Sequence, residues 1–494
     1  MDTLAHRHKQ MLNTWGVTLK LIGTMVALML AGSTFASSWK FTAGVNAGGT
    51  YSNNVALASR EAAKGDWITE ITPIFTVVKT SGRLKMNAHY SLQKLFYDND
   101  RYLDKTYHKL DAIGNAELYK KEIFLDASAS TRQVPTTPFN PTGADNKNAT
   151  GNISNVRTLT ISPYWVHHFG SVAVMNSRFG LSEVDYNNAF VSNSINTASS
   201  LALSSGTAFR LTPWSINYSN QKVNYTNRSN VEFTTASASL GYLVTPRIKL
   251  AGVTGYERNQ YLHTGSAPEG GFWEGNMSWA VSPRTKFEVG LSGHYYGRTK
   301  FLLFTTHGGH LEWKAEYNES VMTSNSQGIY PTYLVASGGK PIWIFADTAQ
   351  IQTDSVFLNK RFQTELAWKR GRNAITANVY HSSQVAQEVG QLSYLYQNGA
   401  LQGANSVKKR GVSAAWHYQL TLLVSANLSV NLLRSSYPGL AREDKDTNVQ
   451  LSINRKLSSR MNGSINARRQ ARNSNQNEVD YTENALSTMV VYTF

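Results

Sequence analysis

The chain has 494 residues and contains no cysteine, so no disulfide framework can hold it together. It also has no apolar run long enough for a membrane-spanning helix. The longest marked run covers residues 21–32, whereas a helix needs about 20 apolar residues to cross a bilayer. No Pro/Gly/Ser tract, charge block or low-complexity stretch divides the chain, although a soluble chain of this length usually forms several domains. These absences disfavour a helical membrane protein and a string of small domains.

The N-terminus is typical of an export signal. Arg7, Lys9 and Lys20 precede or border the apolar run 21–32, and the small-residue segment STFA follows and ends at Ala36. We therefore predict a signal peptide over residues 1–36, cleaved after Ala36, and an exported domain over residues 37–494. A membrane anchor is the alternative, but the run is short for one.

From Trp39 to Phe494, apolar and polar residues alternate with a period of two, as in half-exposed β-strands. Residues 422–433 illustrate the pattern, because apolar and polar side chains fall on opposite faces of one strand. The apolar set, which we expect to face lipid, is Leu422, Val424, Ala426, Leu428 and Val430, and the polar set is Ser425, Asn427 and Ser429. Such alternation explains a mean hydropathy of only −0.34, and the 25 Tyr, 19 Phe and 11 Trp suit the aromatic girdles of a membrane barrel.

The connections between the alternating segments differ in length. One set is short, as at 79–83, 245–247, 282–284 and 369–373, and the other is long and polar, as at 51–65, 135–155, 325–353 and 387–406. This asymmetry is typical of outer-membrane barrels, which have short periplasmic turns and long extracellular loops. We predict an all-β protein: one large antiparallel transmembrane β-barrel of about 22 strands, plus or minus 2, in the bacterial outer membrane. A secreted soluble β-protein shares the periodicity, and composition alone does not exclude it.

The C-terminal segment STMVVYTF ends in an aromatic residue. Leu486, Val490, Tyr492 and Phe494 share one face of this last strand. A terminal strand of this kind resembles the signal that the bacterial barrel-assembly machinery recognises. The physical need is to pair the last strand with the first, so that no open edge remains in lipid.

Five segments carry a resemblance to one family: DWITEITPIFTVV, NAELYKKEIFLDASAS, NVRTLTISPYWVHHFGS, FWEGNMSWAVSPRTKFEVGLSGHYYG and ARRQARNSNQNEVDYTENALSTMVVYTF. They are similar to the outer-membrane β-barrel protein family associated with PEP-CTERM/exosortase systems, over nearly the whole chain after residue 39. The resemblance implies a barrel linked to exopolysaccharide biosynthesis. The family has no assigned biochemical activity, so the resemblance transfers no catalytic or binding residues.

The formal net charge is +16. We expect partners of matching chemistry: outer-membrane lipid and lipopolysaccharide, and an acidic polysaccharide, in addition to the barrel-assembly machinery. No nucleic acid, cofactor or metal is expected. By alternation, eight charged side chains are candidates for the lumen: Glu312, Lys314, Glu316, Arg361, Glu365, Lys409, Arg468 and Arg472.

Three functions remain open. The first is a pore or conduit associated with exopolysaccharide export or with PEP-CTERM surface systems, with a modest anion preference. The second is a structural or adhesive barrel with a closed lumen, whose long loops bind a glycan or a surface protein. The third is a rim-sited enzyme using Ser292, His294 or His417, which a catalytic constellation within hydrogen-bond reach would support. We expect the protein not to be an enzyme.

Overall fold

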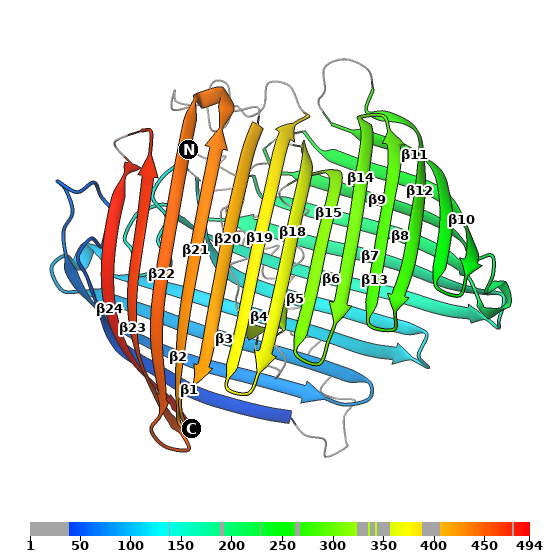
Figure 1. Ribbon diagram of the computed structural model, residues 1–494. Coiled ribbons are helices and arrows are strands. Elements are labelled where there is room, and N and C mark those ends of the chain that lie inside the picture. Colours follow the sequence, from blue (N-terminus) through cyan, green and yellow to red (C-terminus); the bar gives the residue numbers. More distant parts are fainter. Residues whose placement is uncertain are drawn as a thin grey trace, which may run out of the picture.

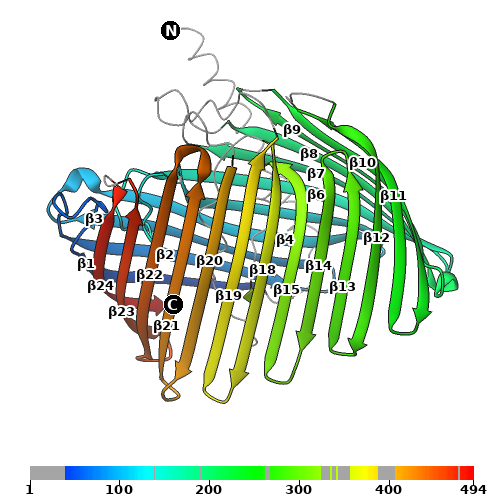
Figure 2. The ribbon, with the colours of Figure 1, turned by 45° about the horizontal axis from the view of Figure 1, so that its top comes forward.

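The computed structural model describes residues 39–494 except 138, 188–191, 228, 262–266, 324–333, 336–340, 343–355, 388–405 and 477–478. Residues 1–36, predicted to be a signal peptide, lie outside the described part of the chain. Twenty-two strands form one sheet, and the first strand, β1 (Trp39–Ser52), pairs antiparallel with the last, β24 (Tyr481–Thr493). The sheet therefore closes into a barrel (Figures 1 and 2), which confirms the predicted fold.

Each barrel strand pairs with the next one along the chain, except that β15 pairs with β18, because β16 and β17 form a small separate hairpin. The other strands are β2 (Asp66–Thr80), β3 (Leu84–Tyr97), β4 (Lys105–Tyr119), β5 (Ile123–Pro135), β6 (Ile153–Phe169), β7 (Ala173–Tyr186), β8 (Ser194–Ser205), β9 (Trp214–Tyr225), β10 (Val231–Thr245), β11 (Ile248–Gln260), β12 (Glu269–Ser282), β13 (Thr285–His294), β14 (Gly297–His307), β15 (Leu311–Thr323), β16 (Leu334–Val335), β17 (Pro341–Ile342), β18 (Val356–Arg370), β19 (Asn373–Ala386), β20 (Ser406–Gln419), β21 (Val424–Tyr437), β22 (Arg442–Lys456) and β23 (Met461–Ser474). The described residues also include the 3₁₀ turns η1 (Arg101–Leu103), η2 (Thr207–Phe209) and η4 (Pro438–Leu440). Within the described ranges, no helix is long and apolar enough to cross a membrane.

The two ends of the barrel differ in their connections. Short turns gather at one end, where the C-terminus also lies (Figure 1). In one of these turns, between β4 and β5, Lys120 and Lys121 both adopt positive φ angles, 37° and 60°. Two central residues with positive φ match the right-handed twist of a tight hairpin. Because outer-membrane barrels place short turns in the periplasm, this end is periplasmic.

Side chains alternate between the outer wall and the lumen. On β21 the even-numbered residues face outward, as Leu432 shows with 45% of its surface exposed, and Asn427 lines the lumen. The prediction that Leu422 belongs to the lipid-facing row of this strand is wrong, because β21 begins at Val424. Leu422 precedes β21 in a turn closed by Thr421, whose Oγ1 accepts from the Val424 N–H at 3.1 Å. Strands can cross a bilayer only in a closed sheet, because every backbone N–H and C=O group must be paired away from water. An apolar outer wall then faces the lipid.

The extracellular part of the lumen is packed rather than empty. One apolar cluster joins Val55, Ile68, Leu95 and Tyr97 to Ala149, a residue of the long connection between β5 and β6. Polar side chains inside the barrel are also buried at this level, including Glu70 and Glu483. Long extracellular connections therefore fold back into the barrel, and this is where the candidate site lies.

Candidate functional site

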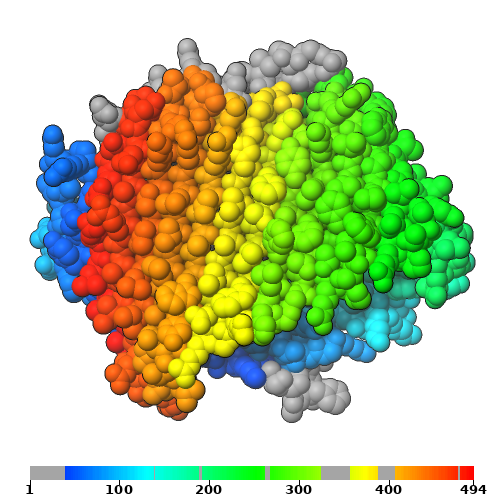
Figure 3. Space-filling model, in the orientation of Figure 1, coloured from blue at the N-terminus to red at the C-terminus, as the bar shows by residue number. Residues whose placement is uncertain are grey.

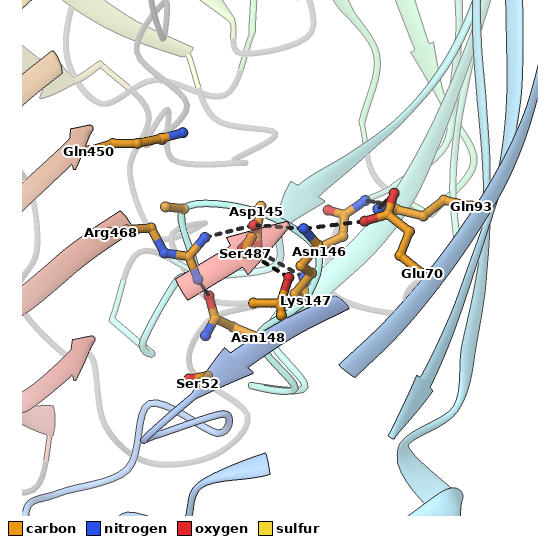
Figure 4. A network of polar contacts seen from close by, with 12 residues as sticks. Ser52, Glu70, Gln93, Asp145, Asn146, Lys147, Asn148, Gln450, Arg468 and Ser487 are labelled. Atoms are coloured by element: carbon orange, nitrogen blue, oxygen red, sulfur yellow. Dashed lines mark hydrogen bonds and ion pairs between the residues drawn. The ribbon is translucent and has the colours of Figure 1, made fainter. Parts of the chain in front are cut away.

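The connection between β5 and β6, described at residues 136–137 and 139–152, lies against the inner wall of the barrel (Figure 4), and we call it the inward loop. It reaches past β4, β3 and β2 to the inner faces of β22, β23 and β24. Figure 4 shows Asp145 of this loop between Arg468 on one side and Glu70 and Gln93 on the other. The inward loop thus bridges parts of the wall that are distant in sequence, and it narrows the lumen.

Ion pairs hold the tip of the inward loop. Arg468 on β23 lies 2.6 Å from Asp145 and 3.0 Å from Glu483 on β24, measured between guanidinium nitrogen and carboxylate oxygen. On the other side Lys147 lies 3.2 Å from Glu70 on β2. Burial alone would raise the pKa of Asp145, but Arg468 and Lys147 hold that pKa below its usual value. The carboxylate form is therefore the one that docks the loop.

Amide hydrogen bonds surround these charges. Asn148 of the inward loop donates to Glu483 at 2.8 Å and accepts from Gln470 at 3.0 Å. Gln470 in turn accepts from the Ala144 N–H at 2.9 Å. Glu483 is fully buried, and Asn148, the Ser52 hydroxyl at 2.7 Å and Arg468 all donate to its carboxylate, which would otherwise be costly inside the barrel.

A second group of contacts fixes the first part of the inward loop. Arg472 donates to the carbonyl of Asn140 at 3.1 Å while pairing with Asp446 at 2.6 Å. The ring of Phe139 packs on Tyr437, with centroids 4.8 Å apart. Both halves of the loop are therefore attached to the wall formed by β21–β24.

Toward the periplasmic end, the lumen holds a cavity of about 1070 Å³. Its lining includes the charged Glu312, Lys369 and Arg372 at the periplasmic turns and apolar side chains such as Trp368 and Trp416. Amides and hydroxyls on inward positions of β19–β22 supply much of the polar part. The inward-facing polar side chains include Thr376, His417, Asn427, Ser429, Gln450, Ser452 and Asn454. Such groups both donate and accept hydrogen bonds, so the cavity suits a polar solute rich in hydroxyls.

The eight charged residues predicted to face the lumen all lie on inward-facing strand positions. The structure brings two of these eight, Arg468 and Arg472, to the inward loop. The others lie on β15, β18 and β20, where Lys314 pairs with Glu316 at 2.5 Å and Arg361 donates to Gln363, a neighbour of Glu365. Lys409 is buried and Glu312 lines the periplasmic cavity. Because carboxylates pair with Arg468 and Arg472, those two arginines add little to any net field in the lumen.

The inward loop itself escaped the sequence-derived site. Asp145, Lys147 and Asn148 stand in a polar stretch that resembles any long outer loop, and their partners lie more than 300 positions away in the chain or on β2. The alternation in the sequence predicted that Arg468 and Arg472 face the lumen. It did not predict that a loop would bind to them.

One set of side-chain contacts bears on the hypothesis of a rim-sited enzyme. Ser292 and His294 share the inward face of β13, with His294 Nε2 3.1 Å from Ser292 Oγ, and His294 Nδ1 contacts Glu257 on β11. His417 is not part of this group, because it contacts Asn427. Ser292 is only 5% exposed, and its hydroxyl also bonds Thr299 at 2.5 Å. The arrangement has the order of a catalytic triad, but the serine is closed off from the lumen.

No family model matches the chain, and no curated protein matches it. Solved structures do. The FrpB iron transporter from Neisseria meningitidis (F5-1 variant) matches with a TM-score of 0.53 and 10% identity, covering 93% of this chain and 83% of that chain. The F3-3 variant of FrpB matches with a TM-score of 0.50 and 10% identity, covering 92% and 82%. At this identity the likeness shows the fold alone.

The closed sheet, the apolar outer wall and these matches define the class of protein. It is an outer-membrane β-barrel, located in the bacterial outer membrane.

Proposed function

We propose that the protein is an outer-membrane conduit for a polar, hydroxyl-rich solute, associated with exopolysaccharide export or PEP-CTERM surface systems. The observation that carries the proposal is the lumen cavity of about 1070 Å³, with the amides and hydroxyls that β19–β22 contribute to its lining. Polar lining lowers the barrier for a solute that must leave bulk water to enter the barrel.

The chemistry of the lining favours a saccharide over a small ion. Asn427, Gln450 and Asn454 each offer both donors and acceptors, which match sugar hydroxyls. The two inward arginines with the strongest links to the loop are neutralised by carboxylates. The resemblance to barrels of exosortase systems supports a glycan as solute, and the FrpB likeness adds no argument for iron.

The inward loop sets the width of this conduit. Its attachment to both β2 and β23 keeps it within the lumen, above the cavity. Solute passage then depends on the space that the docked loop leaves, and a released loop should widen it.

Block of single-channel current by an oligosaccharide tests the proposal. Purified barrel in a planar bilayer should conduct, and maltohexaose added on the periplasmic side should interrupt the current. The double variant N427A/Q450A should weaken that block several-fold, because it removes two hydrogen-bonding side chains from the cavity. Asn217→Ala, an inward position on the opposite strand β9, is the control and should block like the wild type.

Two results would contradict the proposal. Conductance without any saccharide block would reject the saccharide specificity and leave a general pore. No conductance at all would instead support the closed structural or adhesive barrel, whose outer loops bind a glycan or a surface protein.

A second candidate function, hydrolysis, is favoured only by the contacts between Ser292, His294 and Glu257. Covalent labelling of Ser292 by a fluorophosphonate probe, lost in Ser292→Ala, would support it. We expect no labelling, because the serine is buried and the strand N–H groups around it are engaged with β12 and β14.

A further inference from the structure

Three basic side chains form a row on the outer wall, and we call Arg410, Arg434 and Lys445 the basic row. They are direct cross-strand neighbours on β20, β21 and β22, since Arg410 lies opposite Arg434 and Arg434 lies opposite Lys445. All three are exposed and share the outward phase of Val412 and Leu432. The wall that carries them faces the viewer in Figure 3.

The basic row lies at the extracellular border of the apolar band. On β21 the outward positions from Val424 to Leu432 are all apolar, and Arg434 follows. Arg434 is ten positions after Val424. With a rise of about 3.3 Å per residue and a strand tilt of about 40°, it sits about 25 Å above Val424. This is the height of the apolar band in such barrels, so the row meets the outer leaflet at headgroup level.

Two other outward cations, Arg258 and Lys360, each lie beside an acid. Arg258 lies 3.6 Å from Glu269, and Lys360 lies 2.9 Å from Glu319. The basic row differs, because its members face one another across neighbouring strands. Like charges in directly opposed positions destabilise a sheet. The row therefore carries a cost that an anion between the side chains would remove.

Within the described part of the chain, one acid contacts the basic row. Glu443 lies 2.6 Å from Arg434 and 3.6 Å from Lys445. Glu443 can neutralise only one of the three positive charges. Lys408, the outward residue two positions before Arg410 on β20, adds a further positive charge. An excess of positive charge remains at the membrane surface.

A groove of about 610 Å³ lies beside the basic row on the same wall. The row lines its upper part, and Phe362, Val379, Val412 and Leu432 provide apolar lining below. A site with cations at headgroup level and an apolar groove toward the bilayer centre matches a lipid that carries phosphate on its headgroup.

We propose that the basic row and its groove bind a phosphorylated glycolipid of the outer leaflet. Phosphate oxygens accept hydrogen bonds from Arg410, Arg434 and Lys445, and an acyl chain occupies the groove. The site is on the outside of the barrel, so it is independent of any passage through the lumen.

Native mass spectrometry of the full barrel in detergent, with added bisphosphorylated lipid A, tests this proposal. The wild type should bind it at least tenfold more tightly than the triple variant R410Q/R434Q/K445Q. The matched control K222Q/R258Q/K360Q removes three outward cations that lie opposite or beside acids, and it should stay within about twofold of the wild type. Equal affinity of the wild type and the triple variant would overturn the proposal.

Two further arms separate the possible ligands. Dephosphorylated lipid A should bind the wild type at least tenfold more weakly, and equal binding would show that the groove recognises acyl chains alone. Excess inorganic phosphate should leave bound lipid A in place, whereas its release would show a site for the free anion and overturn the lipid assignment.

Thermal unfolding gives an independent test, because the triple substitution should affect the unfolding midpoint differently without lipid and with lipid A. In lipid-free detergent the triple variant should unfold no earlier than the wild type, because it loses like-charge repulsion. Lipid A should then raise the unfolding midpoint of the wild type more than that of the variant. Equal shifts for both proteins would contradict a phosphate site at the basic row.

Discussion

Replacing Arg468 by glutamine should release the inward loop from the barrel wall. Arg468 joins Asp145 of the loop to the fully buried Glu483 of β24. Glutamine keeps a polar side chain but leaves Glu483 without its cation, and it leaves Asp145 with Lys147, whose Nζ lies 4.0 Å away. The loop can relieve this by moving Asp145 into water, whereas Glu483 stays in the wall.

The free-energy cost of the substitution can be estimated from the burial of the ion pairs that Arg468 makes. Removing one partner of a buried, hydrogen-bonded ion pair costs about 3–5 kcal/mol. The lower end applies here, because the Asp145 side chain is 36% exposed and partly solvated while docked. About 3 kcal/mol corresponds to roughly a hundredfold shift of the docking equilibrium toward the released loop.

The absence of cysteine makes the assay simple. Ala144→Cys in the inward loop introduces a single thiol, whose reaction with a bulky maleimide reports loop release. Arg468→Gln should raise the labelling rate by at least tenfold over the parent Ala144→Cys protein. Arg469→Gln is the control, since Arg469 is exposed on the outer face and contacts Asn484. Equal labelling rates for the Arg468 and Arg469 variants would refute the docking role of Arg468.

The remaining predictions concern pH, selectivity, register and assembly. Because the pKa of Asp145 is lowered, loop docking should hold from neutral pH downward and weaken only below the ordinary carboxyl value of 3.8, so maleimide labelling already enhanced at pH 6 would contradict the pairing. If the barrel conducts, Arg361→Gln should shift the reversal potential in a salt gradient toward less anion preference, and an unchanged potential would remove Arg361 from the permeation path. Arginine at Leu428, on the outer face, should lower stability in lipid by about 2–4 kcal/mol, and arginine at Asn427, in the lumen, by far less; equal losses on urea titration would contradict the β21 register. Deletion of Phe494, whose N–H donates to the Ala43 carbonyl at 2.9 Å where the barrel closes, should reduce the heat-modifiable barrel in outer-membrane fractions, and an undiminished yield would contradict its role in assembly.

Local patterns were sufficient to predict much of the fold. The alternation that separates Val412 from Lys409 and Leu428 from Asn427 sets the face of each side chain, because the period of a strand is two. The same alternation placed Arg468 and Arg472 in the lumen. The length difference between the two sets of connections predicted which end is periplasmic, and the succession of alternating segments from Trp39 to Phe494 predicted about 22 strands.

The candidate site required pairings that no local pattern contains. The contact between Asp145 and Arg468 joins the β5–β6 connection to β23, so it depends on barrel closure and on how one long loop folds. Alternation also assigns Arg410, Arg434 and Lys445 to the outer face one by one. That they stand level with one another follows only from the registers of two hairpins, which depend on turn geometry.

Single-channel recording tests the central claim most directly, namely that the lumen is a conduit narrowed by the inward loop. The two proteins to compare in planar bilayers are the wild type and a variant in which a short Gly-Ser linker replaces residues 139–149. The account predicts a small conductance for the wild type and a several-fold larger one for the variant, whose lumen lacks the docked segment. Absence of conductance in both proteins would contradict it.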